Sequence, residues 1–267
     1  MSDSALEPSQ SPRVFTQASE AAPTGVTSSA TLFCDFDGPI VDVSDRYYAT
    51  YRMGLEHIQA VSQKQVPIQV RYLSKVQFWA FKQNRVPDRQ IALWSGLEGS
   101  QINDFLSYVA QIVNQPTLLH QDRLQPGVRQ SLKLLRCHGI RVVLVTLRAP
   151  EQVVEFLQQH HLDWAFSGLY GMSQLDAAYT NQANHKIQRL RDAIADQHHH
   201  GYSTQTSWMI GDTEADIMAG QSAGLPTAAL TCGIRSSNYL KAFRPTLLLP
   251  DLWSTAQHIT SQVALRV

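Results

Sequence analysis

The chain has 267 residues with 22 basic and 22 acidic side chains, so its formal net charge is zero, and 43% of its residues are hydrophobic. A general nucleic-acid binder carries a basic excess and a disordered chain lacks this apolar content, so both classes are disfavoured. The three cysteines are odd in number and far apart, which argues against a disulfide framework or a zinc site and favours a reducing compartment.

The N-terminal segment, residues 1–29, is rich in Ser, Thr, Pro, Ala and Gln and has few large apolar residues. This composition predicts a disordered tail. A transit peptide is the alternative, but Asp3, Glu7 and Glu20 argue against that acid-poor class. The sequence has no apolar signal core and no apolar run near the roughly 20 residues that a spanning helix needs. We therefore expect a cytoplasmic protein that does not contact a membrane.

Short apolar runs bounded by turn residues indicate strands that are buried on both faces of a sheet. They cover residues 31–34, 140–145, 208–210, 227–230 and 246–249. Helical patterns lie between these runs. One begins at Pro150, and two others end at Gly139 and Gly224. Strands that alternate with helices predict an α/β fold with a Rossmann-like, three-layer parallel sheet.

The stretch between the first two apolar runs is about a hundred residues long, which is too long for a simple crossover. Helical patterns cover residues 47–58, 70–79, 91–94 and 102–113. Pro67 and Pro87 stand where helices can begin. We therefore expect a small helical domain at residues 44–120, inserted into a core formed by residues 30–43 and 121–267.

The segment Asp35-Phe36-Asp37-Gly38 follows the first predicted strand, at the sheet edge where open α/β sheets bind ligands. In extended backbone, residues i and i+2 point the same way, so Asp35 and Asp37 present two carboxylates to one small volume. Such a pair needs a cation or a shared proton. Gly38 and Pro39 provide the sharp exit from the strand. Taken alone, the segment is equally consistent with an acidic turn at a strand end.

A second acidic segment, residues 211–216, follows the third apolar run. Asp212 and Asp216 are four residues apart, so both can face the sheet edge if a helix begins at Thr213. Helix capping is the alternative explanation for acidic residues at this position. The explanation is weaker for Asp212, because this residue lies at the strand end.

Two further polar residues accompany these acids. Thr146 ends the second apolar run, shortly before a predicted helix start whose backbone N–H groups could hold a phosphate. Lys186 opens the helix before the third run. Taken alone, Thr146 is a weak signal, and an isolated lysine at such a position is normally exposed to solvent.

Together these residues resemble the four motifs of the haloacid dehalogenase superfamily of phosphatases. The motif residues, in chain order, are Asp35, Asp37, Thr146, Lys186, Asp212 and Asp216. The resemblance covers residues 30–235, and the helical insertion is similar to the cap domain of phosphoglycolate-phosphatase-like members. Two positions depart from the usual pattern, because Pro39 replaces a threonine and Leu147-Arg148 replaces a segment that begins with asparagine.

The resemblance implies a Mg²⁺-dependent phosphatase that acts on a small phosphorylated metabolite. Asp35 would be the nucleophile that forms an aspartyl-phosphate, and Asp37 would be the general acid and base. Mg²⁺ would bind Asp35, the backbone carbonyl of Asp37, and Asp212. The implied substrate-binding residues are Thr146, Leu147, Arg148 and Lys186. The implied supporting residues are Gly38, Gly211 and Asp216. Arg148 would meet an anionic substrate or, alternatively, lie on the surface.

Two other functions stay open at this point. One is a phosphomutase of the same superfamily, and the other is a catalytically silent binding or regulatory protein that keeps the fold. The presence of all the motif residues together weakens the second alternative. A carbon–halogen hydrolase is disfavoured, because a departing halide needs no general acid and Asp37 would supply one.

Overall fold

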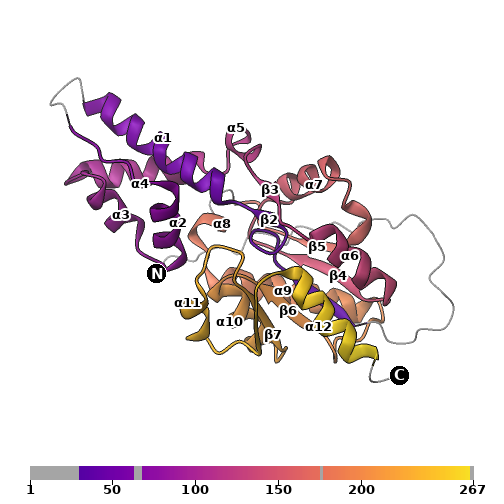
Figure 1. Cartoon of the computed structure of the whole chain (residues 1–267). Helices are drawn as coiled ribbons and strands as arrows, with labels where there is room; N and C mark the ends of the chain where they lie inside the picture. Colours follow the sequence, from indigo (N-terminus) through magenta and orange to yellow (C-terminus); the bar gives the residue numbers. More distant parts are fainter. Residues whose placement is uncertain (1–29, 63–67, 175–176, 265–267) are drawn as a thin grey trace, which may run out of the picture.

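The computed structural model describes residues 30–62, 68–174 and 177–264, so the predicted tail at residues 1–29 lies outside the described residues. A six-stranded sheet with the order β5-β4-β1-β6-β7-β8 forms its centre (Figure 1). The strands are β1 (Thr31–Cys34), β4 (Arg141–Val145), β5 (Gly168–Tyr170), β6 (Trp208–Gly211), β7 (Thr227–Leu230) and β8 (Leu247–Leu249). Every neighbouring pair in this sheet is parallel.

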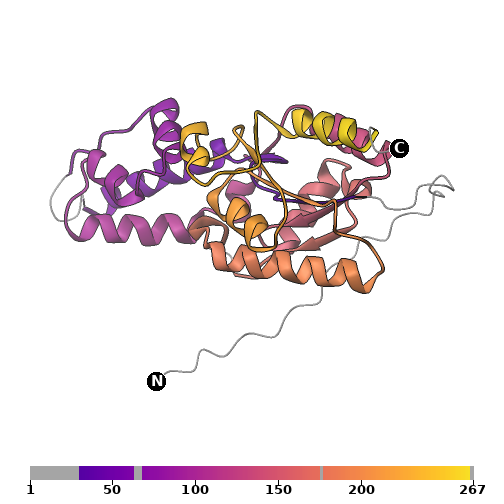
Figure 2. The same cartoon turned by 90° about the horizontal axis from the view of Figure 1, so that it is seen from below.

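The central strands alternate their side chains between two apolar cores, one on each face of the sheet. On β1, Leu32 and Cys34 join one core and Phe33 joins the other. The first core is completed by α6 (Val128–Cys137), α7 (Pro150–Gln159) and α12 (Leu252–Ala264), and the second by α9 (Ala183–His199) and α10 (Glu214–Ser222). Figure 2 shows α9 and α12 on opposite faces. This arrangement confirms the predicted α/β, Rossmann-like parallel sheet.

All five predicted strands are present, but the sequence analysis missed β5. This strand has only three residues, Gly168–Tyr170, and a glycine also follows it. A run this short carries too little periodicity to be distinguished from a turn. The remaining short elements of this half of the chain are η1 (Asp163–Ala165), α8 (Ala177–Thr180) and α11 (Ser237–Lys241).

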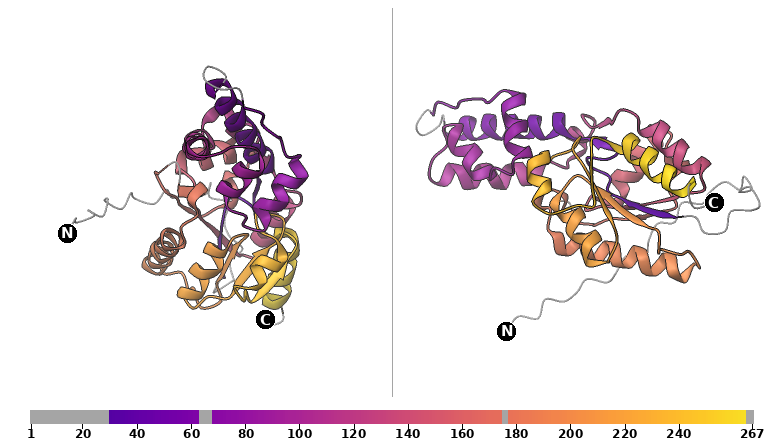
Figure 3. Two further views of the ribbon diagram at one scale, coloured as in Figure 1. Left: turned by 90° about the vertical axis from the view of Figure 1, so that its left-hand side faces the viewer. Right: turned by 60° about the horizontal axis from the view of Figure 1, so that its bottom comes forward.

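A group of helices lies between β2 (Val41–Asp42) and β3 (Arg123–Leu124). They are α1 (Ser44–Ser62), α2 (Lys75–Gln83), α3 (Asp88–Trp94), α4 (Ser100–Ile112) and α5 (Pro116–Leu119). Figures 1 and 3 show α1 to α4 packed together beside the sheet. Strands β2 and β3 pair antiparallel, so the chain leaves the core and returns to it along adjacent paths. We call residues 44–119 the helical segment.

The second helix of this segment begins later than predicted. The apolar pattern at residues 70–79 predicted a helix, but α2 begins at Lys75. The hydroxyl of Ser74 accepts a hydrogen bond from the backbone N–H of Gln77, and the Gln77 side chain accepts one from the backbone of Ser74. This reciprocal capping box fixes the helix start. Pro67, the other predicted start, lies outside the described residues.

In the part of the chain that the structure describes, no helix combines the length and the apolar character needed to cross a membrane.

Candidate active site

Asp35 is anchored at the carboxyl end of β1. Its backbone N–H donates to the carbonyl oxygen of Ile210 on β6 at 2.8 Å, and its Oδ1 accepts from the backbone N–H of Phe36 at 2.7 Å. The residue is buried. Burial raises the pKa of Asp35 to about 7, although the attraction of Lys186 opposes this shift. The carboxylate is therefore fixed in place and largely removed from water.

Three buried carboxylates converge at this edge of the sheet. Asp35, Asp212 and Asp216 each offer an oxygen, and these oxygens all lie within 4.8 Å of one another. Burial, together with the nearby charges of Asp216 and Asp35, raises the pKa of Asp212 well above its ordinary value. We call these three carboxylates the acidic cluster.

One buried oxygen of the acidic cluster has neither a hydrogen bond nor an ion pair among the described residues. Asp212 Oδ2 accepts a hydrogen bond from the backbone N–H of Ile234 at 2.6 Å, whereas Asp212 Oδ1 is buried and has no hydrogen-bond partner among the described residues. A buried, unpartnered carboxylate oxygen is costly unless a cation binds it. Carboxylate oxygens are the donors that Mg²⁺ prefers, so these residues fit such an ion.

Lys186 supplies a positive charge to the same cluster. It lies in the first turn of α9, and its Nζ is 2.8 Å from Asp35 Oδ1, 2.9 Å from Asp216 Oδ1 and 3.2 Å from the carbonyl oxygen of Val145. Burial lowers the pKa of Lys186, but Asp216 and Asp35 outweigh it, so the pKa is raised. The side chain is 1% exposed, so the alternative of a solvent-exposed lysine is wrong.

Asp216 serves the helix as well as the lysine. Its Oδ2 accepts hydrogen bonds from the backbone N–H and the hydroxyl of Thr213, at 3.0 and 2.7 Å. Thr213 is the N-cap of α10, so this is a capping box. One oxygen of Asp216 thus caps a helix while the other pairs with Lys186. The capping explanation and the site explanation both apply to this residue.

Glycines make room for the acidic cluster. A Cβ on Gly38 would lie 2.1 Å from Asp212 Cγ, and a Cβ on Gly211 would lie 2.1 Å from Asp216 Cγ. Gly38 also has a φ of +92°, a conformation that side chains rarely allow. The sequence analysis missed Gly233, where a Cβ would lie 1.9 Å from Asp212 Oδ2. Any side chain at these positions would displace a carboxylate.

Thr146 and Leu147 follow β4 and face the same cavity as Asp35. Both are buried, and the backbone N–H of Thr146 donates to the carbonyl oxygen of Tyr170 at 2.9 Å. The cavity opens to solvent, and about 570 Å³ of empty space lies between its walls, open solvent included. Its lining also includes Asp37, Gly38, Lys186, Asp212 and Thr213. The structure thus brings most of the predicted site residues to one cavity.

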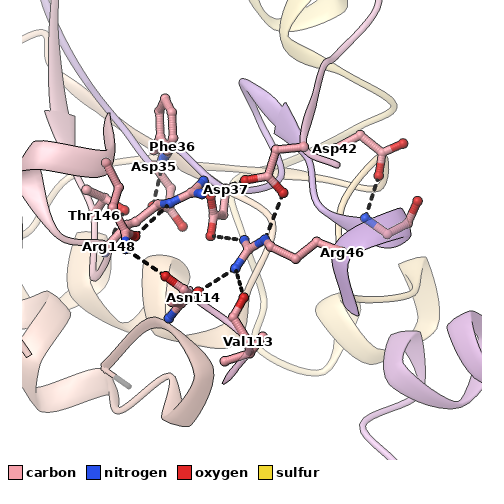
Figure 4. Close-up of polar contacts among 12 residues, drawn as sticks. Asp35, Phe36, Asp37, Asp42, Arg46, Val113, Asn114, Thr146 and Arg148 are labelled. Atoms are coloured by element: carbon pink, nitrogen blue, oxygen red, sulfur yellow. Dashed lines mark hydrogen bonds and ion pairs between the residues drawn. The ribbon is translucent and has the colours of Figure 1, made fainter. Parts of the chain in front are cut away.

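Arg148 is buried next to the first motif. Its side chain is 2% exposed, so the surface alternative is wrong, and it is not among the described residues that line this cavity. Its guanidinium binds Asp37 Oδ1 at 2.9 Å and also Asp122 Oδ2. The buried Arg46 of α1 binds the other oxygen of each carboxylate, Asp37 Oδ2 at 3.2 Å and Asp122 Oδ1 at 2.7 Å. Figure 4 shows both arginines pointing toward Asp37.

These four residues, Asp37, Arg46, Asp122 and Arg148, form what we call the arginine ring. Burial alone would raise the pKa of Asp37, but Arg148 and Arg46 outweigh burial and hold that pKa below its ordinary value. The sequence analysis missed Arg46 and Asp122. They are 76 positions apart and belong to no recognised motif, so no local signal pointed to them.

The helical segment forms the opposite wall of the cavity, through Tyr47, Lys82 and Arg85. The Lys82 ammonium lies 2.7 Å from Asp88 Oδ1. Across the cavity, Arg235 Nε lies 2.8 Å from Glu214 Oε2 and Arg85 Nε lies 3.1 Å from Glu214 Oε1. Of these ion pairs, the one between Arg85 and Glu214 joins the helical segment to the sheet core. The sequence analysis also missed them, because each cation is isolated in the sequence.

Helix α2 is also joined to the core by two hydrogen bonds of Gln83. The backbone N–H of Ser236 donates to the carbonyl oxygen of Gln83 at 2.8 Å. The Gln83 side chain donates to the carbonyl oxygen of Gly233 at 3.4 Å. The loop that follows β7 therefore contacts both the helical segment and, through Ile234, the carboxylate of Asp212.

Sequence comparison establishes the family of this chain. A sequence model of the haloacid dehalogenase-like hydrolases matches residues 32–230, a span that runs from the second residue of β1 to the last residue of β7. The chain belongs to the haloacid dehalogenase-like hydrolase family. The family resemblance predicted from the motif residues is thereby confirmed.

Individual relatives match this chain at low sequence identity. The chain is 26% identical to a phosphoglycolate phosphatase of Pseudomonas putida over 222 residues, a match that covers 82% of this chain and 75% of the relative. It is 27% identical to the pyrophosphatase PpaX of Halalkalibacterium halodurans over 139 residues, which is 50% of this chain and 61% of the relative's length. The second match therefore spans less than two thirds of that relative.

A solved structure has the same fold. A haloacid dehalogenase-like hydrolase of Streptococcus pneumoniae superimposes with a TM-score of 0.60 at 18% identity. The superposition covers 87% of this chain and 99% of the other. At this identity the likeness supports the fold, and the chemistry of the site is argued from its own residues.

Proposed function

We propose that this protein is a Mg²⁺-dependent phosphatase that hydrolyses a small phosphorylated metabolite through an aspartyl-phosphate intermediate. The observation that carries this proposal is the position of Asp35. Its carboxylate lies at the carboxyl edge of a parallel sheet, 2.8 Å from the Lys186 ammonium and beside Asp212 and Asp216, and it lines a cavity that opens to solvent. The phosphatases among its sequence relatives support the same reaction class.

In the first proposed step, an oxygen of Asp35 attacks phosphorus while the bond from phosphorus to the leaving oxygen breaks. Asp37 must be protonated for this step, a form that Arg148 and Arg46 disfavour, and it gives its proton to that oxygen. In the second step, water attacks the phosphorus of the aspartyl-phosphate, the bond from phosphorus to the Asp35 oxygen breaks, Asp37 takes a proton from the water, and inorganic phosphate leaves. Lys186, Thr146 and the backbone at Leu147 bind the phosphoryl oxygens throughout.

The acidic cluster would hold the metal ion. Asp35, Asp212 and the backbone carbonyl of Asp37 are the proposed ligands, and Asp216 orients Lys186. When bound, Mg²⁺ would offset the repulsion among the carboxylates and stabilise charge on the transferring phosphoryl group. The unpartnered Asp212 Oδ1 supports this assignment.

The helical segment is the proposed cap domain of this phosphatase. Tyr47, Lys82 and Arg85 line the cavity opposite Asp35, so they are positioned to contact the leaving group rather than the phosphoryl group. Closure of such a cap excludes water while the phosphoryl group is transferred. The specificity for a metabolite would therefore reside in side chains of this segment.

A cytoplasmic location is part of the same proposal. The cysteines Cys34, Cys137 and Cys232 are all free, which supports a reducing compartment.

The proposal is tested by hydrolysis of p-nitrophenyl phosphate. We expect no turnover in EDTA, recovery on addition of Mg²⁺, and no turnover by Asp35→Asn under either condition. The Asp45→Asn protein is the matched control, since it changes an aspartate outside the cavity. Equal activity of the wild type in EDTA and in Mg²⁺, or full activity of Asp35→Asn, would contradict the proposal.

A further inference from the structure

The arginine ring has a regular pattern of charges. Each guanidinium bridges the two carboxylates, so Arg46 binds Asp37 Oδ2 and Asp122 Oδ1, and Arg148 binds Asp37 Oδ1 and Asp122 Oδ2. All four carboxylate oxygens are thereby engaged. Two guanidiniums that hold the two oxygens of one carboxylate fix the plane of that carboxylate as well as its position.

The ring members come from four separate parts of the chain. Asp37 follows β1, Arg46 lies in the first turns of α1, Asp122 directly precedes β3, and Arg148 follows β4. The ring therefore joins both connections of the helical segment to the sheet core. An outer layer supports it, because Arg46 also donates to the carbonyl oxygen of Val113 at 3.1 Å and to Asn114.

The ring is almost entirely buried, and only Asp37 has an appreciable exposed fraction. The side chains of Arg46 and Asp122 are fully buried and that of Arg148 is 2% exposed, whereas that of Asp37 is 19% exposed and lines the cavity beside Asp35. A buried ion network of this kind contributes little net stability, because desolvation offsets the attraction between the charges. Stability alone therefore does not account for a ring that opens into the reaction cavity.

We infer that Arg46 and Asp122 are positioning residues which, together with Arg148, hold the Asp37 carboxylate in the orientation that meets the leaving-group oxygen. The inference rests on the acid–base role of Asp37 in the proposed function. Asp122 acts indirectly, because it binds the two guanidiniums that bind Asp37. A displacement of about 1 Å in a reacting group can reduce a rate by about 10²-fold, so orientation of this carboxylate matters.

The test compares two double variants that each preserve net charge. Arg46→Met combined with Asp122→Asn opens the ring but leaves Asp37 paired with Arg148. Asp45→Asn combined with Arg123→Gln is the matched control, because it changes the adjacent residues of the same two chain segments. These residues form an outer ion pair at 3.0 Å that does not touch Asp37.

The measured quantity is kcat/KM, which reports the steps through formation of the phosphoenzyme. With an alkyl phosphate, whose leaving oxygen needs a proton, we expect the ring variant to lose about 10- to 100-fold, which does not exceed the lower end of the roughly 10²- to 10⁴-fold contribution of general acid catalysis, because Asp37 itself is kept. With acetyl phosphate, whose leaving group needs little protonation, we expect a change below about threefold. The control variant should match the wild type on both substrates.

The same ring variant made in the Asp37→Asn protein separates a positioning role from general structural damage. In the Asp37→Asn protein the ring variant should cause no further loss on the alkyl phosphate, because the group that it positions is already gone. Equal losses on both substrates, a gain on the alkyl phosphate, or a full additional loss in the Asp37→Asn background would each overturn the inference.

A third variant covers the case in which the ring double variant does not fold. Arg46→Lys keeps the charge, but a single ammonium cannot bridge both carboxylates in the same way. It should show the same selective loss on the alkyl phosphate, and wild-type rates for this protein would overturn the inference. If Asp37→Asn itself shows no dependence on the leaving group, the acid–base role of Asp37 fails, and the inference fails with it.

Discussion

Two buried charge clusters lie on either side of the first motif, and they differ in their charge balance. The acidic cluster and Lys186 combine three carboxylates with one ammonium, a formal charge of −2. The arginine ring combines two carboxylates with two guanidiniums, a formal charge of zero. One divalent cation would neutralise the unbalanced cluster, whereas the ring is already neutral. The charge balance therefore supports the proposed metal site in the acidic cluster and the proposed positioning role of the ring.

The same difference governs two aspartates of a single motif. Burial raises the pKa of Asp35 to about 7, because Lys186 only partly compensates for the burial and for the nearby Asp216. Burial also acts on Asp37, but Arg148 and Arg46 outweigh it and lower that pKa. Residues two positions apart therefore experience opposite electrostatic surroundings. A cation bound to the acidic cluster would favour the ionised form of Asp35.

The largest expected effect on stability comes from breaking the balance of the ring. Asp122→Asn leaves two buried guanidiniums with one carboxylate between them. Removing one partner of a buried ion pair costs about 3–5 kcal/mol in the free energy of unfolding, so we expect a loss in this range. Urea denaturation monitored by circular dichroism measures it. A loss below about 1 kcal/mol, the range of exposed ion pairs, would show that the ring is not an electrostatic unit.

Removal of a carboxylate from the acidic cluster is expected to stabilise the protein, in contrast to removal of one from the ring. Asp212→Asn removes one negative charge from a cluster that has an excess of them, so in EDTA we expect this protein to be more stable than the wild type by about 1 kcal/mol. Saturating Mg²⁺ should then raise the melting temperature of the wild type more than that of the variant. A variant that is less stable than the wild type in EDTA would contradict the charge count.

The smallest effect is expected at the exposed pair beside the ring. A hydrogen bond from Lys75, together with the charges of Lys75 and Arg123, lowers the pKa of Asp45 despite partial burial. A group whose folded-state pKa is lowered stabilises the protein above its unfolded pKa, and this contribution is lost as the pH falls through the folded value.

Asp45→Asn should therefore cost less than about 1 kcal/mol at pH 7, because the pair is exposed. The difference from the wild type should begin to shrink below about pH 4, near the ordinary aspartate pKa, and should disappear once the pH lies below the lowered folded-state pKa. Denaturation curves of both proteins at pH 7 and pH 3 measure this decrease. A difference as large at pH 3 as at pH 7 would show that the Asp45 side chain stabilises the fold by packing and not by its charge.

Much of the fold and of the acidic cluster was predictable because the signals are local. Buried strands gave continuous apolar runs, and parallel strands bring their carboxyl ends to one edge, so Asp35, Thr146 and Asp212 were expected to meet there. The contact of Lys186 with Asp35 followed from the family resemblance. The short strand β5 contains too few consecutive apolar residues to be predicted from the sequence.

The arginine ring was not predictable, for a physical reason. Its partners are brought together by the return of the chain after the helical segment, and 76 positions separate Arg46 from Asp122. Arg148 could be placed after a strand, but whether it meets a substrate, solvent or another side chain depends on those distant residues. Long-range ion pairs between isolated residues leave no periodic signal in a sequence.

The most direct test of the central claim identifies the atom that receives the phosphoryl group. Asp37→Asn impairs activation of water, so this protein should accumulate phosphoenzyme when it is mixed with Mg²⁺ and acetyl phosphate. Mass spectrometry of acid-quenched, digested samples should place the phosphate on Asp35, and the Asp35→Asn protein should carry none. Phosphate found on Asp37, on a histidine or on Cys34, or retained in Asp35→Asn, would contradict the account.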